Sequence, residues 1–333
     1  MTQHFIESSF CEKDKQFEVP LRPKTMSDFI GQESVRELLE VQIQAATLRK
    51  EPLNHLLFCG PPGLGKTTLS HIIADSMGTD IVVTSGPVIE RAGDLAGILS
   101  KLKDGDVLFI DEIHALNRTI EEYLYPAMED FVLDLIIEAG TNARSVKVKL
   151  SRFTLVGATT RLGLLSAPLR SRFQVSFRLD YYSTQTLQQI LNRSSRILGM
   201  QLDEESSFEI AKRSRGTPRI ANNLLRWVRD FAQIKANNVV SKSVVQTALT
   251  MIGVDERGLD EMDVKILKVL IEHYKGGPVG IQTLALAVGE EPHTIEEVNE
   301  PFLITQGFIK RTPRGREATS LAFTYFSEGE TKP

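Results

Sequence analysis

The chain has 333 residues, of which 41% are hydrophobic and 25% charged, and its formal net charge at pH 7 is −4. This is the composition of an ordinary soluble globular protein, the length predicts two or three domains, and no apolar run reaches the roughly 18 residues of a membrane helix. The negative total argues against a surface coated with basic charge, although local clusters of lysine and arginine could still bind nucleic acid.

The first residues carry no targeting pattern. Residues 1–18 mix polar and acidic side chains without a basic flank or an apolar core, so they do not predict a signal peptide. The two cysteines, Cys11 and Cys59, lack metal-binding spacing, and Cys59 ends an apolar run that predicts a buried, reduced thiol. We therefore expect a cytoplasmic protein with no membrane association.

Short apolar runs rich in β-branched residues alternate with helical patterns in the first half of the chain. They lie at Leu56–Phe58, Ile81–Thr84, Val107–Ile110, Phe153–Val156 and Val175–Leu179. Strands separated by helices predict a parallel sheet covered on both faces, which is an α/β fold. One of these helices is expected to start at Lys66 and to stop at Gly78, because glycine commonly ends helices.

The segment Gly60–Thr67 reads GPPGLGKT and matches the phosphate-binding pattern GxxxxGK[ST] between a predicted strand and a predicted helix. Glycines let the backbone wrap a phosphate closely, and the amides at a helix N-terminus point at the anion. Lys66 is expected to reach the β- and γ-phosphates of ATP, and the Thr67 hydroxyl to ligate Mg²⁺. The flanking strand and helix distinguish this match from a chance one, so the sequence predicts an ATP site.

Paired carboxylates follow the apolar run Val107–Ile110. Asp111 is expected to hold the Mg²⁺ shell, as in phosphate-loop NTPases generally. Glu112 can polarise the attacking water as a general base, so hydrolysis, beyond mere binding, depends on it. Without the phosphate-binding loop, the same pair would be read as exposed charges after a buried strand.

Val132–Leu150 breaks the alternation of strands and helices. It contains two alternating runs around Gly140–Thr141–Asn142, and this pattern predicts a β-hairpin inserted before the Phe153 strand. Such a hairpin would project from the sheet. It either binds a partner protein or is an edge hairpin without one, and the residues leave both open.

After about Tyr182 the strand pattern stops, and a small helical domain is predicted. Thr184–Leu198 forms one helix, Thr217–Pro218 opens a second with an N-cap and a first-position proline, and a third follows Ser241. Arg219 lies in the first turn of the second helix, where the helix dipole disfavours a cation. An anionic partner such as a γ-phosphate is therefore expected for Arg219.

From about Glu256 the pattern changes again. Three helical candidates precede two short apolar segments, in the order Asp263–His273, Ile281–Val288, Pro292–Thr305, Gly307–Ile309 and Leu321–Phe323. The two apolar segments are expected to flank a charged turn, Lys310–Glu317. Three helices followed by a two-stranded wing form the winged-helix pattern.

The charges of this unit bear on DNA binding. The third helix and its approach hold five glutamates, namely Glu290, Glu291, Glu296, Glu297 and Glu300. Phosphates would repel such a helix, so sequence reading in a major groove is not expected. The wing carries four cations, Lys310, Arg311, Arg314 and Arg316, which are enough to hold a DNA backbone of any sequence. The alternative is a solvated loop.

These motifs in this order resemble the AAA+ ATPases, and more closely the RuvB family of Holliday junction branch-migration motors. The segments that carry the resemblance are Leu21–Lys24, Phe29–Gln32, Gly60–Leu69, Val107–Leu116, Gly157–Arg161 and Ser171–Phe173. It extends from about Phe17 to Phe326. It implies a large ATPase domain in residues 1–182 with the hairpin at 132–150, a small all-α lid domain in 183–253, and a C-terminal winged-helix domain in 254–333.

The resemblance also implies roles for single residues. Thr160 matches sensor 1, Arg172 the arginine finger given to the neighbouring subunit's ATP, and Arg219 sensor 2. The expected catalytic residues are Lys66, Asp111, Glu112, Thr160 and Arg172, and the expected metal ligands are Thr67 and Asp111. The residues expected to hold ATP are Leu21, Arg22, Gly63, Gly65, Lys66, Thr67, Thr68, Glu129, Asp130, Phe131, Arg172, Tyr182 and Arg219.

The activity implied by the resemblance is that of an ATP hydrolase that uses ATP and Mg²⁺ and works as a homohexamer, because its finger acts in trans. It would pull duplex DNA of any sequence to drive branch migration of Holliday junctions in homologous recombination and DNA repair. RuvA would bind the hairpin, RuvC would join the complex, and Arg311, Arg314 and Arg316 would contact DNA.

Two other functions compete with the motor. One is a nucleotide-switched initiator that reads DNA sequence, against which the acidic third helix counts. The other is a clamp-loader-like ATPase, which the wing does not suit.

Overall fold

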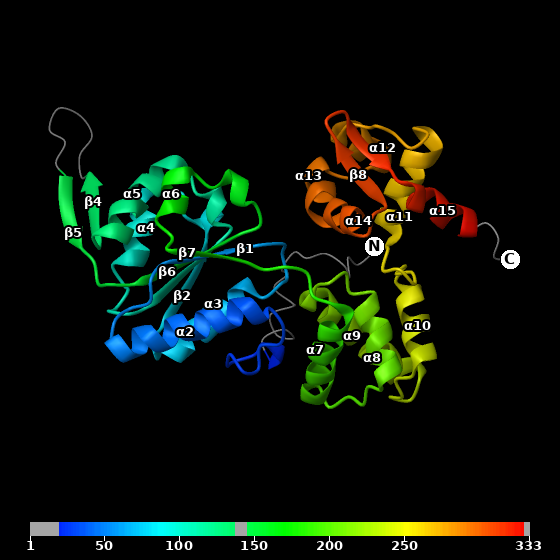
Figure 1. The fold of residues 1–333 in the computed structure, drawn as a ribbon, viewed down its shortest axis with the longest axis horizontal. Coiled ribbons are helices and arrows are strands. Elements are labelled where there is room, and N and C mark those ends of the chain that lie inside the picture. Colours follow the sequence, from blue (N-terminus) through cyan, green and yellow to red (C-terminus); the bar gives the residue numbers. More distant parts are fainter. Residues whose placement is uncertain (1–19, 137–144, 330–333) are drawn as a thin grey trace. The chain divides into compact units, whose positions relative to one another are not determined.

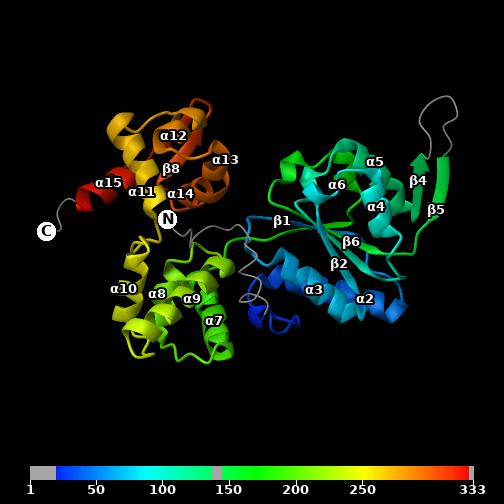
Figure 2. The same ribbon diagram turned by 180° about the vertical axis from the view of Figure 1, so that it is seen from behind.

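The computed structural model describes residues 20–136 and 145–329. The chain divides into two compact units, with the boundary between Tyr182 and Ser183 (Figures 1 and 2). The expected hairpin turn at Gly140–Asn142 and Cys11 lie outside the described residues. Cys59 is a buried free thiol, as its apolar context predicted. No helix in the described ranges is long and apolar enough to cross a membrane.

A five-stranded parallel sheet forms the centre of the first unit. Its order is β2 (Ile81–Ser85), β3 (Val107–Asp111), β6 (Thr154–Thr159), β1 (Leu56–Cys59) and β7 (Val175–Arg178). Every neighbouring pair is parallel, with Leu57 opposite Gly157 and Ile110 also opposite Gly157. Four strands coincide with the predicted runs to within one residue at each end, β6 extends three residues beyond the predicted Phe153–Val156, and the α/β prediction is confirmed.

Helices cover both faces of this sheet, which explains the continuous apolar runs of its central strands. Helices α2 (Glu33–Arg49) and α3 (Lys66–Met77) lie on one face, and α4 (Ala92–Leu99), α5 (Arg118–Glu129) and α6 (Ala167–Ser171) on the other (Figure 1). On the second face Leu57, Leu108 and Leu155 pack in one core with Leu95 and Leu124. Helix α3 starts at Lys66 and ends before Gly78 as predicted.

The predicted hairpin is present as a separate two-stranded antiparallel sheet of β4 (Val132–Ile136) and β5 (Ser145–Lys149). Its register pairs Val132 with Lys149 and Ile136 with Ser145. Leu133 is buried in the core below α5, with Val148 packed against it. The base of the hairpin is therefore anchored, and its strands project beyond the five-stranded sheet (Figures 1 and 2).

The second unit begins with α7 (Thr184–Ile197), α8 (Glu204–Lys212), α9 (Pro218–Lys235) and α10 (Lys242–Met251). Ser183, Asp203 and Ser241 cap α7, α8 and α10, each accepting a hydrogen bond from the amide three residues on. Thr217 is the N-cap residue of α9 as predicted, but its side chain accepts no hydrogen bond from the first turn of the helix. Its hydroxyl instead donates to the Arg215 carbonyl oxygen at 3.2 Å. The first-position proline lacks an N–H, which reduces the need for a cap.

The winged-helix part follows from Glu261. Its helical segments are α11 (Glu261–Lys268) continued by the π-helical turn η4 (Val269–His273), α12 (Ile281–Val288), and a third segment of α13 (Pro292–Thr294), η5 (Ile295–Asn299) and α14 (Glu300–Thr305). Leu267, Leu284, Leu303 and Phe308 meet in its core. The predicted three helices are thus present, although the third includes a π-helical turn.

The wing differs from the prediction. Its strands are β8 (Ile309–Thr312) and β9 (Gly315–Ala318), so all but the first and last of their residues lie in the segment Lys310–Glu317 that was expected to be a turn. Leu321–Phe323 belongs instead to helix α15 (Ser320–Gly329). The tight reversal depends on Gly315, whose φ is 137° and whose Cβ, if present, would lie 2.3 Å from the Val279 carbonyl oxygen. The strand assignment of Leu321–Phe323 was wrong because short apolar runs do not distinguish strands from helices.

Candidate active site and nucleic-acid surface

The phosphate-binding loop connects the end of β1 to the start of α3. Gly60, Gly63 and Gly65 have φ values of 144°, 77° and 102°. A Cβ on Gly60 would lie 2.4 Å from the Leu179 carbonyl oxygen, and one on Gly65 would lie 3.0 Å from the Phe29 ring. Both the backbone conformation and the close approach therefore require glycine at these two positions.

Lys66 follows this loop and is 7% exposed. Its ammonium donates to the carbonyl oxygens of Gly60 at 2.8 Å and Pro61 at 2.9 Å, so the side chain folds back over the loop. Thr67 and Thr68 lie in the first turn of α3 and are partly exposed. The first amides of a helix have no partner within it. A cation and these amides thus gather at one place, and the site suits an anion such as a phosphate.

Asp111 and Glu112 lie at the carboxyl end of β3, beside the end of β6. Glu112 has φ 47°, and its amide donates to Asp111 Oδ1 at 3.0 Å. The Thr160 hydroxyl donates to Glu112 Oε2 at 3.2 Å. Because β1, β3 and β6 are parallel and adjacent, the phosphate-binding loop and these groups end at the same edge of the sheet, where α/β proteins bind ligands.

Sequence reasoning did not single out His114, which belongs to the same cluster. Its Nδ1 lies 3.2 Å from Glu112 Oε2 and 2.8 Å from the Thr159 hydroxyl oxygen. The Glu112 side chain remains 38% exposed. The carboxylate is therefore held from two sides while staying within reach of water. The only hint in the sequence that His114 belongs to the site was its position two residues after the Asp-Glu pair, and such proximity is weak evidence.

The oxygen donors at this edge fit Mg²⁺. Thr67 offers a hydroxyl and Asp111 a carboxylate, which are the oxygen ligands that this ion takes. Among the described residues no three His, Cys, Asp or Glu side chains form a metal-binding group. An ion here would have few protein ligands, and Mg²⁺ is usually bound in this way, with the rest of its shell supplied by water and phosphate.

Arg172 follows α6 and is held by three contacts within its own unit. Its guanidinium lies 4.1 Å from the centre of the Tyr125 ring, Nη1 donates to the Pro168 carbonyl oxygen at 2.8 Å, and Nη2 lies 3.2 Å from Glu129 Oε1. The side chain is 20% exposed. Glu129, which we expected at the nucleotide, thus has its carboxylate beside Arg172 in this protomer.

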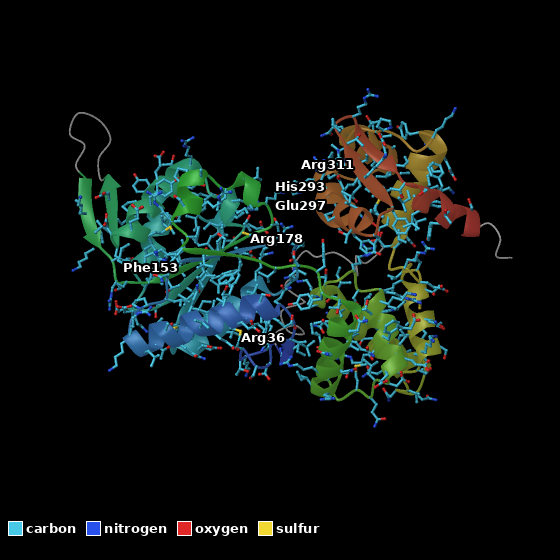
Figure 3. The ribbon with its side chains drawn as sticks, viewed as in Figure 1. Arg36, Phe153, Arg178, His293, Glu297 and Arg311 are labelled. Atoms are coloured by element: carbon cyan, nitrogen blue, oxygen red, sulfur yellow. The ribbon has the colours of Figure 1, made fainter. Side chains whose placement is uncertain are left out.

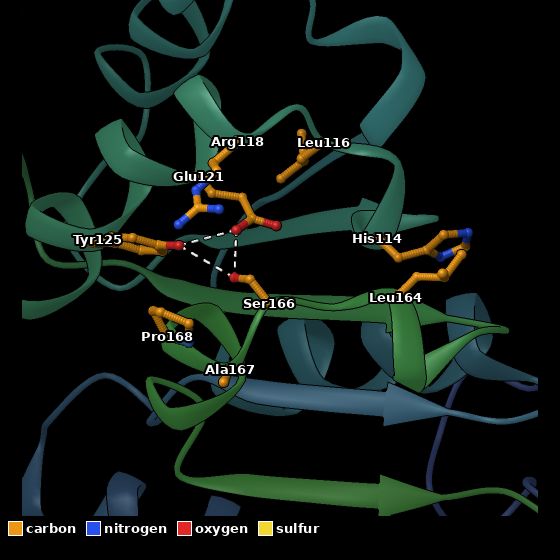
Figure 4. A pocket seen from close by; sticks show the side chains of 9 residues that line it. All are labelled: His114, Leu116, Arg118, Glu121, Tyr125, Leu164, Ser166, Ala167 and Pro168. Carbon is orange, nitrogen blue, oxygen red and sulfur yellow. Dashed lines mark hydrogen bonds between the residues drawn. The ribbon is translucent and has the colours of Figure 1, made fainter.

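A cavity of about 420 Å³ is lined by residues of α5, η3 (Leu162–Leu164) and α6, among them Tyr125 and Pro168, which both contact Arg172 (Figure 4). Glu121 lines it, is 5% exposed, and accepts hydrogen bonds from the Tyr125 hydroxyl at 3.0 Å and from the Ser166 hydroxyl. Ser166 in turn caps α6 by accepting from the Leu169 amide. These bonds connect Tyr125 to the start of α6, the helix that precedes Arg172, so they hold in place the ring on which the Arg172 guanidinium stacks.

The other residues expected at the nucleotide are spread over both units. The Tyr182 hydroxyl donates to the Leu64 carbonyl oxygen at 3.1 Å, and burial raises the pKa of Tyr182, which keeps it a neutral donor. Leu21 is buried, whereas Arg22 is half-buried. Asp130 is exposed, and Phe131 packs edge-on against Phe153. Arg219 lies in the first turn of α9, in the second unit.

The wing corrects one predicted DNA contact. Arg316 is 6% exposed, and its Nη2 lies 2.7 Å from Glu296 Oε1 and 2.8 Å from Glu300 Oε2. Its guanidinium therefore binds the third helical segment and is not available to a phosphate. Two glutamates that we took to repel DNA instead anchor the wing.

The exposed cations of the wing are Lys310, Arg311 and Arg314. Arg311 is 63% exposed, with Nη2 3.7 Å from Glu296 Oε1. Figure 3 shows it on the winged-helix part together with His293 and Glu297, whose Nδ1 and Oε2 lie 3.3 Å apart. Lys310 pairs with Glu317 at 2.8 Å. Arg314 is exposed in the turn between β8 and β9. Any contact between this wing and the sugar-phosphate backbone of DNA therefore depends on fewer cations than the four that the sequence indicated.

Three family models match successive parts of the chain. They describe the Holliday junction DNA helicase RuvB P-loop domain (residues 21–179), the RuvB AAA lid domain (182–255) and the RuvB C-terminal winged helix domain (256–327). These matches, together with the parallel sheet, confirm the predicted order of an AAA+ sheet domain, a lid and a winged helix.

The chain is also similar to individual proteins. The Holliday junction branch migration complex subunit RuvB of Protochlamydia amoebophila is 64% identical over 325 residues, which is 98% of each chain. That of Staphylococcus saprophyticus is 53% identical over 332 residues, covering 100% of this chain and 99% of the relative. The solved Thermotoga maritima RuvB Holliday junction branch migration motor is 47% identical, has a TM-score of 0.84, and matches 92% of this chain and 98% of its own.

Proposed function

The chain belongs to the RuvB family of Holliday junction branch-migration ATPases, and on this basis we propose how its residues bind and hydrolyse ATP. It is an ATP-hydrolysing DNA motor that acts in branch migration during recombination and DNA repair. One observation carries the residue assignments: Lys66, Asp111 and Glu112 lie at the same edge of the sheet, with Glu112 hydrogen-bonded by Thr160.

ATP binds with its phosphates in the loop Gly60–Gly65. On binding, the Lys66 ammonium exchanges the carbonyl oxygens of Gly60 and Pro61 for phosphate oxygens, which are better partners because they are charged. Thr67 and Asp111 hold Mg²⁺, which would neutralise charge on the phosphates. The other residues proposed to hold ATP are Leu21, Arg22, Gly63, Gly65, Thr68, Glu129, Asp130, Phe131, Tyr182 and Arg219.

Glu112 accepts the proton of the attacking water as general base. The hydroxyl of Thr160 bonds to Oε2, which leaves Oε1 for the water. General-base catalysis of this kind contributes about 10²–10⁴-fold to a rate. Thr160, and by the same geometry His114, orient the carboxylate.

Arg172 acts on the ATP of the adjacent subunit. Its partner Glu129 is 55% exposed, and such an exposed pair is weak, so the guanidinium can exchange this carboxylate for a phosphate at little cost. A finger supplied in trans requires an adjacent subunit in a head-to-tail contact, and we propose that these contacts close into a homohexameric ring.

The remaining assignments concern partners and domains. We propose a large ATPase domain in residues 1–182, a lid in 183–253 and a winged helix in 254–333. The hairpin β4–β5 binds RuvA, RuvC joins the assembly, and Arg311 and Arg314 contact the DNA backbone without reading sequence. We place the protein in the cytoplasm.

The decisive experiment is ATP-dependent conversion of a synthetic four-way junction into duplex products, with and without RuvA. We expect conversion that depends on RuvA and on Mg²⁺. Glu112→Gln is the matched control, because it keeps the size of the side chain and removes the base. No conversion by the wild-type chain with RuvA present would overturn the proposal.

A further inference from the structure

Arg215 is a buried cation in the loop that joins α8 to α9. Its side chain is 3% exposed, and its backbone has φ 53°, a conformation that non-glycine residues rarely adopt. The residues Gly216, Thr217 and Pro218 follow it and lead directly to Arg219, in the first turn of α9. A fully buried guanidinium is costly unless it is paired. Its partners therefore show what the loop is fixed to.

Those partners come from the winged-helix part and from the segment that leads to it. Arg215 Nε donates to the Gly258 carbonyl oxygen at 2.9 Å, and Nη2 contacts Asp260 at 3.1 Å and, more closely, Asp263. The guanidinium also lies 4.4 Å from the centre of the Phe302 ring. One side chain from the loop before α9 is thus bound to both ends of the first turn of α11 and to α14.

Asp263 extends this network. It is fully buried, and its second oxygen accepts a hydrogen bond from Asn299 Nδ2 at 2.7 Å, which adds the π-helical turn η5. The covalent connection in the same region contains Gly253 and Gly258, both at positive φ. Glycine tolerates these dihedral angles, and the Gly258 carbonyl oxygen is itself a partner of Arg215, so this part of the connection is fixed by the network. The buried network resists displacement, because breaking a buried pair leaves an uncompensated charge.

We propose that Arg215 is a positioning residue for the motor reaction, coupling the nucleotide-sensing start of α9 to the winged-helix part through its bonds to Asp260 and Asp263. The proposal rests on the proposed function, in which Arg219 senses the nucleotide. Any shift of Arg219 on hydrolysis displaces the loop that holds Arg215. The network then passes this shift to α11 and α14, and the glycine-containing connection does not absorb it.

Arg213 provides a matched control. It is 2% exposed, as buried as Arg215, but it pairs with Glu209 at 3.0 Å, four residues earlier in the chain. Removing either arginine breaks a buried ion pair in the same region, so both changes should destabilise the unit. Only the Arg215 pair extends from the lid to the winged-helix part.

The test compares full-length Arg215→Met and Arg213→Met with wild type at pH 8, in the presence of RuvA. The measured quantity is the number of junctions converted per ATP hydrolysed, alongside ATP affinity and DNA-free ATPase rate. For Arg215→Met we expect this ratio to fall by roughly 5- to 150-fold, the range of typical coupling free energies. ATP affinity and DNA-free turnover should stay near wild type. Arg213→Met should keep the wild-type ratio.

A ratio in Arg215→Met that equals that of Arg213→Met would overturn the proposal. If Arg215→Met does not fold, Asp263→Asn serves instead, because it keeps the shape of the side chain and removes the charge, and an unchanged ratio there is equally decisive. Differential scanning calorimetry gives an independent readout: the lid and the winged helix should melt together in Arg213→Met and separately in Arg215→Met. Absence of junction conversion by wild type would instead refute the proposed function.

Discussion

Replacing Arg172 with alanine should abolish ATP turnover at a much smaller cost in stability. Within the chain the change removes a stacking contact with Tyr125, worth about 0.5–1 kcal/mol, a hydrogen bond to the Pro168 carbonyl oxygen, worth about 0.5–1.5 kcal/mol, and a half-exposed ion pair with Glu129, worth at most about 1 kcal/mol. Loss of an arginine finger slows related NTPases by about 10³–10⁵-fold, which corresponds to a barrier increase of roughly 4–7 kcal/mol. The loss of turnover therefore greatly exceeds any effect of partial unfolding.

The assay is a mixing experiment with two inactive variants. An Arg172→Ala subunit keeps its own Lys66 and Glu112 but gives no finger, whereas a Glu112→Gln subunit gives a finger but cannot hydrolyse. If the subunits form the proposed ring with head-to-tail contacts, random mixing should join an intact site to an intact finger at about a quarter of the interfaces. Steady-state ATPase activity should therefore rise well above that of either variant alone.

Mixed rings that stay at background would show that Arg172 acts within its own subunit or not at all. Normal turnover in Arg172→Ala alone would refute the finger assignment directly. Arg170→Ala is the matched control, since Arg170 is an exposed arginine in α6, two residues before Arg172, and should be dispensable.

Three further results are expected. Glu112→Gln should bind ATP as tightly as wild type, by equilibrium titration, and hydrolyse it about 10²–10⁴-fold more slowly; unchanged turnover would exclude it as the base. Arg314→Ala should weaken DNA binding and reduce the slope of log affinity against log salt concentration by about 1. Arg316→Ala should keep that slope but lose about 3–5 kcal/mol of unfolding free energy in chemical denaturation, because Arg316 is buried in an ion pair. Burial, opposed by Arg215, raises the pKa of Asp263 to about 7 from 3.8, so the folded chain holds a proton that the unfolded chain has lost, and stability should fall as pH rises between these values. Asp263→Asn should flatten that fall, and an unchanged pH profile would contradict the shift.

Much of the ATPase unit could be predicted because its signals are local. Parallel strands buried on both faces read as continuous apolar runs, so the predicted runs Leu56–Phe58 and Val107–Ile110 each match the observed strand to within one residue. The phosphate-binding loop combines glycines at forced positive φ with a lysine at a fixed offset, and both are visible in eight consecutive residues. Thr160 was expected near Glu112 only through the family resemblance, and the parallel pairing of β3 with β6 explains why the two residues lie together.

The wing was predicted less well because its structure depends on distant residues. Arg316 is buried by Glu296 and Glu300, which lie 20 and 16 positions earlier in the chain, and no local pattern separates it from the exposed Arg314. Leu321–Phe323 was assigned to a strand, although Ala322, Tyr325 and Phe326 face the core at helical spacing. The spacing of three and four residues between Ala322, Tyr325 and Phe326 was the feature of the sequence that could have predicted a helix here.

The hydrogen bond from Tyr182 to the Leu64 carbonyl oxygen has a mechanical consequence. Tyr182 is the last residue of the first unit, and Ser183, the next residue, already caps α7. Consecutive Cα atoms are held about 3.8 Å apart by a rigid peptide. If the phosphate-binding loop changes shape when it binds a phosphate, Leu64 displaces Tyr182 through this hydrogen bond. Only one peptide bond separates Tyr182 from the N-cap of α7, so this short connection should transmit most of the displacement to the first helix of the lid.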